Sequence, residues 1–253
     1  MTKLNKLFYK ACFIAFLAVA ISFIAPGEKL PVNNKLVIQF ENYVGNDVLK
    51  LDSAVYKNEL GQAYTISKLK YYISNIHLKN RNGKDYISPD YFLVNEDEKK
   101  SKQLLLSSFP VGEYVSISFM LGVDSLHNCS GAQSGALDPV NGMFWAWNTG
   151  YVFLKLEGNS AFSKSTGNIF EYHIGGYQSP HNCIRNINLS FGTDILKSEH
   201  AQNCFLEIKT DVSEVFKSPA TIDFSKLSSV VDLHNATTIA DNYQDMFSII
   251  EIK

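Results

Sequence analysis

The chain has 253 residues, of which 45% are hydrophobic, and its 23 lysines and arginines nearly balance its 25 aspartates and glutamates. The formal net charge of −2 provides no basic surface of the kind that nucleic acids or anionic lipids attract, so we expect neither as a partner. No proline-rich or glycine-serine linker divides the chain. Its length suits one hydrophobic core, and the sequence therefore predicts one domain after a leader.

The first 25 residues have the layout of a secretory signal peptide. Three lysines and no acidic residue precede an uncharged apolar run over 11–25, which is too short to span a bilayer comfortably. Cys12 lies at the start of this run rather than after it, so lipidation is not expected. We expect cleavage between residues 20 and 25, a periplasmic or secreted location, and no stable membrane span in the mature protein.

Alternating apolar and polar residues predict strands along most of the chain. In 114–121 the alternation is typical of an antiparallel strand with one face in the core. The apolar residues change phase near Ser74 and Asn75, which indicates a β-bulge, and Asn82 with Gly83 predicts a hairpin turn with positive dihedrals. The predicted strands are 36–43, 69–79, 114–121, 151–157, 183–191, 205–210 and 247–252.

Helical signals are few. Asp211 is followed three residues later by Glu214, with Pro219 beyond, which predicts a short capped helix over 212–217. Asn235 could cap a second helix. With no βαβ spacing and no repeat, the sequence predicts an all-β fold, namely an antiparallel two-sheet sandwich with one or two short helices.

The segment 122–148 is the exception to this pattern. It lies between two predicted strands, has no periodicity and is rich in glycine, serine, asparagine and aspartate. A connection this long inside a compact domain is usually functional. It carries five side chains of chemical interest, which are His127, Cys129, Met143, Trp145 and Trp147.

The central third of the chain supplies soft metal donors. Copper binds imidazole nitrogen and thioether or thiolate sulfur, so a copper site needs such residues from separate segments. His127, Met143, His173 and His181 are available, and turn residues between the last two could fold one imidazole toward the other. Each residue also has a simpler interpretation, because methionine often fills core gaps and a single histidine is often solvated.

Removal of the leader leaves three cysteines, Cys129, Cys183 and Cys204. In an oxidising compartment an odd number allows at most one internal disulfide, and three pairings are open. One structural bridge plus a buried thiol is the simpler interpretation, and a copper thiolate is the alternative.

Several long motifs follow one another along the chain. They are GVDS at 122–125, SGAQSGALDP at 130–139, GALDPVNGMFWAWNTGYVFLKLEG at 135–158, YHIGG at 172–176 and IADNYQDMF at 239–247. Together they resemble the MbnP-like family, exported copper-binding proteins found with methanobactin operons and beside copper-handling and dihaem peroxidase genes. The likeness covers nearly the whole mature chain, so residues 35–253 are expected to form one MbnP-like domain.

The resemblance implies copper binding without catalysis by the chain itself. In the family a partner dihaem enzyme oxidises a tryptophan to kynurenine, and in related copper proteins its amine joins histidines around Cu(I). By motif this role falls on Trp145 or Trp147; an unmodified indole N–H can only donate, so oxidation would create the ligand. Members from methanobactin operons tend to carry glycine, serine and cysteine after the histidine, whereas Tyr177 follows HIGG here. The implied metal ligands are His173 with members of the set His127, His181, Met143, Trp145 and Trp147.

Two alternatives remain open. A non-metal interaction module at the cell surface could use Trp145, Trp147 and Tyr151 as aromatic anchors for a partner protein. The two tryptophans could also simply fill the core, since they point to the same face of an extended chain. Calcium is less suitable because no D-x-D-x-D-G loop occurs. The chain also has no G-x-S-x-G, P-loop or HExxH motif, so it is not expected to be an enzyme.

Overall fold

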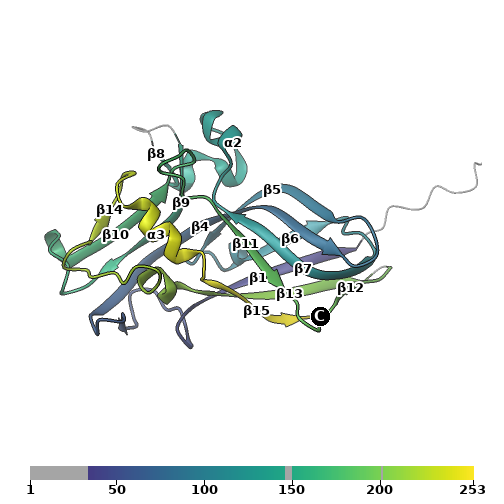
Figure 1. Cartoon of the computed structure of the whole chain (residues 1–253), viewed down its shortest axis with the longest axis horizontal. Coiled ribbons are helices and arrows are strands. Elements are labelled where there is room, and N and C mark those ends of the chain that lie inside the picture. Colours follow the sequence, from purple (N-terminus) through teal and green to yellow (C-terminus); the bar gives the residue numbers. More distant parts are fainter. Residues whose placement is uncertain (1–33, 146–149, 201) are drawn as a thin grey trace, which may run out of the picture. The chain divides into compact units, whose positions relative to one another are not determined.

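The computed structural model describes residues 34–253 except 146–149 and 201 (Figure 1). These residues belong to a unit that spans 33–253. The predicted signal peptide and Trp147 lie outside the described residues. Of the helices in the described part, none is both long and apolar enough to cross a membrane.

In the described part of the chain, five strands form the smaller sheet. Its strand β1 alternates buried and half-buried residues along its length, the two-residue period that one buried face requires. β1 runs parallel to β13, with Lys35 opposite Asn203 and Tyr43 opposite Asp211. In order across the sheet the strands are β15 (Phe247–Ile252), β13 (Asn203–Asp211), β1 (Lys35–Val44) and β2 (Asp47–Val48), with β6 (Gln103–Ser107) also on β1.

Ten strands of the described residues form the larger sheet, which is built around the 18-residue strand β4. The first half of β4 pairs with β9 and its second half with β7. Across the sheet the order is β11 (Arg185–Ser190), β7 (Gly112–Leu121), β4 (Ala63–Asn80), β9 (Gly150–Asn159), β10 (Ile169–Gly175) and β14 (Ser229–Val230). The additional strands are β12 (Leu196–Ser198) on β7, β3 (Tyr56–Lys57) and β5 (Tyr86–Asn95) on β4, and β8 (Phe144–Trp145) on β9.

The bulge predicted in β4 is present. The register shifts between Ser74 and Ile76, and Asn75 has a φ of 50°. The hairpin predicted at Asn82 and Gly83 joins β4 to β5, but it spans 81–85 and neither residue has a positive φ. A longer turn spreads the reversal over more residues, so the left-handed conformation is not needed.

The two sheets pack face to face through aromatic side chains. Phe40 of β1 lies edge-on to Tyr71 of β4 and Phe119 of β7, with ring centroids 6.3 and 5.7 Å apart. The Tyr71 hydroxyl donates to Asn42 Oδ1 at 2.8 Å and so joins the sheets by a hydrogen bond as well. The predicted β-sandwich is therefore confirmed; most strand pairs are antiparallel, while β1 with β13 and β10 with β14 are parallel.

Helical segments are short. The predicted segment after Asp211 is a 3₁₀ helix in which the Asp211 side chain accepts from Ser213 N, and Asn235 precedes α3 without a side-chain capping bond. α2 was not predicted; it lies near β8 at the top of Figure 1. Within the described residues the helical segments are η1 (Lys99–Lys102), α2 (Ser125–Cys129), η2 (Gly135–Leu137), η3 (Pro139–Asn141), η4 (Thr166–Asn168), η5 (Val212–Phe216) and α3 (Ala236–Tyr243).

Candidate functional site

The long connection after β7 is ordered by its own polar side chains. Asp124 begins α2 by accepting a hydrogen bond from His127 N at 3.0 Å. Asn128 is 2% exposed; its Nδ2 donates to Asp124 O at 3.0 Å, and its Oδ1 accepts from Tyr151 N at 2.9 Å. An amide buried to this degree is stable only when it is hydrogen-bonded, so Asn128 fixes α2 against the start of β9.

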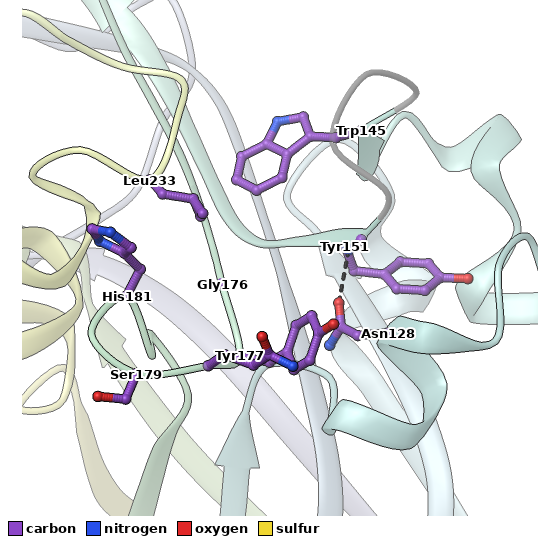
Figure 2. A pocket seen from close by; sticks show the side chains of 10 residues that line it. Asn128, Trp145, Tyr151, Gly176, Tyr177, Ser179, His181 and Leu233 are labelled. Carbon is purple, nitrogen blue, oxygen red and sulfur yellow. Dashed lines mark hydrogen bonds between the residues drawn. The ribbon is translucent and has the colours of Figure 1, made fainter.

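A pocket of about 240 Å³ lies beside α2 and β8. Its wall includes Asn128, Trp145, Tyr177, His181 and Leu233. Figure 2 shows these side chains arranged around the backbone of Gly176, with the indole and the imidazole on different sides of the pocket. The pocket thus combines aromatic surface, neutral polar groups and one imidazole.

The two glycines of the HIGG motif make room for this arrangement. A Cβ on Gly175 would lie 2.8 Å from Trp145 Cζ3, closer than real carbon atoms approach. Gly176 has a φ of +113°, and a Cβ there would meet the backbone oxygen of His181. These positions therefore need glycine so that the indole and the His181 loop can pack closely.

A thiol lies near this pocket. Cys129 is exposed at the end of α2, and its Sγ donates to the hydroxyl of Tyr177 at 3.2 Å. This contact, followed by burial, raises the pKa of the Tyr177 phenol. Sequence reasoning assigned Tyr177 no role in the site and gave Cys129 only the minor alternative of a copper thiolate. The odd number of cysteines left after removal of the leader was the sequence signal that pointed to Cys129.

Of the five predicted ligands that the structure describes, two line the pocket and three do not. Trp145, which is 7% exposed, and His181 line the pocket. Met143 is fully buried in the hydrophobic core, where it packs as a gap filler. Trp147 lies outside the described residues, and the remaining two, His173 and His127, are in other places, each bonded to a carboxylate.

His173 lies on β10 between two buried residues and faces the opposite side of the strand from them. Its Nε2 is 2.8 Å from Glu157 Oε1, and Lys68 Nζ is 2.7 Å from the other oxygen of Glu157. Burial lowers the pKa of the His173 imidazole, and the bond to Glu157 opposes this only in part. His173 is therefore held by its carboxylate partner and does not line the pocket.

His127 belongs to a separate cluster with Asp124 and Tyr91. Its Nδ1 is 2.7 Å from the Tyr91 hydroxyl and 2.9 Å from Asp124 Oδ2, and the Tyr91 hydroxyl also donates to that oxygen. Burial opposes the charged form of Asp124, but the bonds from Tyr91 and His127 outweigh it and lower the carboxyl pKa. Burial, followed by the contact with Asp124, raises the pKa of Tyr91.

None of the three disulfide pairings left open by the sequence is present. Cys129, Cys183 and Cys204 are free. Cys183 and Cys204 are each buried at their own site in the core, and burial raises the pKa of the Cys183 thiol to about 12. The expectation of one bridge is thus not met, because the three sulfur atoms lie in different surroundings.

The alternative of an interaction module with an exposed aromatic face does not hold for Trp145 and Tyr151, the two of its three anchor residues that the structure describes. Trp145 is 7% exposed and Tyr151 is 1% exposed. The Tyr151 hydroxyl donates inward to Leu137 O at 2.8 Å. Side chains buried to this degree cannot act as surface anchors in this conformation.

The sequence model of the MbnP family matches residues 33–235. This chain belongs to the MbnP family. MbnP from Methylosinus trichosporium has a similar fold, with a TM-score of 0.55 and 14% sequence identity over 85% of this chain and 97% of that chain. At this identity the likeness concerns the fold. A comparison with curated proteins yields no match.

The side chains in and beside the pocket of this MbnP-family chain provide some of the ligands that a soft metal ion requires. Within residues 34–253, leaving aside 146–149 and 201, no three His, Cys, Asp or Glu side chains are grouped so as to hold a metal ion. The pocket itself offers one imidazole, that of His181, and the Cys129 thiol contacts its wall at Tyr177. Imidazole and thiolate are both ligands that copper accepts, so the pocket supplies one such donor and a second lies next to its wall.

Proposed function

We propose that this MbnP-family protein is an exported copper-binding protein, and that copper binds in the pocket lined by Trp145 and His181. The observation that carries the proposal is the contact between Cys129 and the pocket residue Tyr177, which brings a thiol toward a pocket that already contains an imidazole. Family membership supports it independently, because the resemblance set out above is to copper-binding proteins.

The chemistry of these donors favours Cu(I). Thiolate and imidazole are soft to borderline ligands, and the exposed Cys129 can lose its proton when a metal ion binds. The Tyr177 hydroxyl would then lose its present donor and could reorient toward solvent. His173 is left out of this ligand set because Glu157 already occupies its Nε2.

A further ligand could come from tryptophan oxidation. Trp145 lines the pocket, and its indole N–H can only donate, whereas kynurenine carries an amine with a lone pair. We propose a partner dihaem peroxidase as the oxidant, as the family resemblance implies. Trp147 stays an alternative target, since the motif does not separate the two residues.

Anaerobic titration of the purified protein with Cu(I) against a chromogenic chelator tests the proposal. His181→Ala and Cys129→Ser should each weaken Cu(I) binding by about 10- to 100-fold. His77→Ala is the matched control, because His77 lies on β4 outside this pocket and pairs with Asp85 at 2.9 Å. Failure of the unaltered protein to compete for Cu(I) would reject copper binding.

Intact mass tests the modification. Protein from its native host should show the small gain that results from exchanging one indole carbon for oxygen, and Trp145→Phe should abolish the gain. A gain that persists in Trp145→Phe assigns the modification to Trp147. Export is tested in the same preparation, which should lack a leader that ends between residues 20 and 25.

A further inference from the structure

A second cluster of donor atoms lies on α2, away from the copper pocket. Residues two positions apart on a helix point in nearly opposite directions, so His127 and Cys129 leave α2 on different sides. Cys129 meets Tyr177, whereas His127 meets Tyr91 of β5 and the helix-capping Asp124. Neither Tyr91 nor Asp124 lines the copper pocket.

The three side chains converge through one atom each. The Tyr91 hydroxyl, His127 Nδ1 and Asp124 Oδ2 are all in mutual contact. The phenol contributes one hydrogen and the imidazole nitrogen at most one, while the ionised carboxylate contributes none. Three contacts therefore share at most two hydrogens, so at least one hydrogen must be shared between two acceptors or one contact has no hydrogen. A cation among the three atoms would satisfy all of them.

Two of the three spacings in the cluster also suit a metal ion, and both involve His127 Nδ1. First-row metal ions hold nitrogen and oxygen ligands at about 2.0 Å, so two ligands at a right angle are about 2.8 Å apart. The distances from His127 Nδ1 to the Tyr91 hydroxyl and to Asp124 Oδ2 are 2.7 and 2.9 Å. The Tyr91 hydroxyl and Asp124 Oδ2 are closer to each other than two ligands of one ion can be, so these two groups must move apart for an ion to contact all three donors.

Solvent reaches the cluster. The side chains of His127 and Asp124 are 34% and 35% exposed. Tyr91 also lines a hollow of about 270 Å³ that includes Asn95 and Glu98. An ion could therefore arrive from the surface and keep water in its remaining coordination positions.

We propose that Tyr91, Asp124 and His127 form a second metal site. It binds a divalent first-row metal ion through the phenolate, carboxylate and imidazole groups. Cu(II) is the expected ion, because it heads the affinity order of divalent metals at nitrogen and oxygen ligands. Binding releases the phenol proton of Tyr91 to solvent as the oxygen–metal bond forms. The site has no sulfur donor, so it differs in metal preference from the proposed Cu(I) site, which includes the Cys129 thiol.

The test uses the full mature chain with Cys129→Ser and His181→Ala, so that the pocket donors are absent. Aerobic titration with Cu(II) should give one bound ion, a visible phenolate-to-copper charge-transfer band and an electron paramagnetic resonance signal with nitrogen coupling. Adding Tyr91→Phe should remove the band and weaken binding by about tenfold or more. Adding His127→Gln should remove the nitrogen coupling.

Two further variants separate binding from folding. Asp124→Asn keeps an acceptor for the α2 cap but removes the charge, so it should lose Cu(II) affinity while the melting temperature changes little. His77→Gln alters a comparable His–Asp pair that has no phenol, and it should leave Cu(II) binding unchanged. Absence of a bound Cu(II), or a band that persists in Tyr91→Phe, overturns the proposal. Neither result affects the Cu(I) titration of the pocket, so the two proposals fail separately.

Discussion

Cys129 Sγ lies 3.2 Å from the hydroxyl of Tyr177, although the two residues are 48 positions apart in the chain. The contact joins α2 to the loop that follows β10, and both segments contribute residues to the wall of the pocket. The environment of this thiol therefore reports on the position of Tyr177 in the pocket wall.

The first prediction concerns thiol reactivity. Among the cysteines that the structure describes only Cys129 is exposed, so in the folded protein a chromogenic disulfide reagent should modify this thiol quickly and the buried Cys183 and Cys204 only after unfolding. Cys129→Ser should remove the fast phase. Prior loading with Cu(I) should slow it, whereas an unaffected rate would argue against Cys129 as a copper ligand.

The second prediction concerns the close packing at Gly175. A Cβ there would lie 2.5 Å from Tyr151 O and 2.8 Å from Trp145 Cζ3, so Gly175→Ala must displace either the strand or the indole. We expect a loss of about 1–3 kcal/mol in the free energy of unfolding and a shifted tryptophan fluorescence spectrum. Gly83→Ala is the control, because its Cβ would meet the Asn80 side chain only at 3.4 Å. Equal stability of the two variants would contradict the packing described here.

The third prediction is a pH dependence from His173. Burial lowers the pKa of its imidazole below the usual 6.5, so between that value and the folded-state pKa the unfolded chain binds more protons. The free energy of unfolding should therefore fall as pH decreases below about 6.5. Urea denaturation between about pH 7 and 5 measures it, and His173→Gln should flatten the slope in this range. An unchanged slope in the variant would assign the dependence to other groups.

The fourth prediction concerns Lys102, whose side chain is only 9% exposed. Its Nζ lies 3.1 Å from Glu41 Oε1 and 3.3 Å from Glu96 Oε1. Lys102→Met would leave two carboxylates close together without a cation, at a cost of about 3–5 kcal/mol in chemical denaturation. Lys253→Met removes an exposed pair with Glu251 and should cost about 1 kcal/mol or less.

Local pattern predicted most of the strands because burial on one face of a sheet imposes a two-residue period. The same alternation also predicts which face of its strand His173 occupies. It lies between Tyr172 and Ile174, which are both fully buried, so alternation places its imidazole on the other face of β10. The family resemblance suggested a site shared with the tryptophans, whereas the imidazole of His173 bonds to Glu157 and is not among the residues that line the pocket.

Other features had no local signal. The parallel pairing of β1 with β13 and the contact of Cys129 with Tyr177 each join segments that only the complete fold brings together. That His181 lines the pocket depends on the loop over 176–182, whose path follows from the packing around Gly176. The position of Tyr91 beside α2 likewise depends on the register of β5 against β4.

The parallel pair of β1 and β13 makes folding depend on the end of the chain. β1 begins at Lys35, yet the strand that covers one of its edges begins at Asn203 (Figure 1). A nascent or truncated chain that stops before this point leaves an apolar strand with an open edge, which is prone to pair with another molecule. Such long-range closure is slow, so assembly of the sandwich becomes a late step that the last fifty or so residues control.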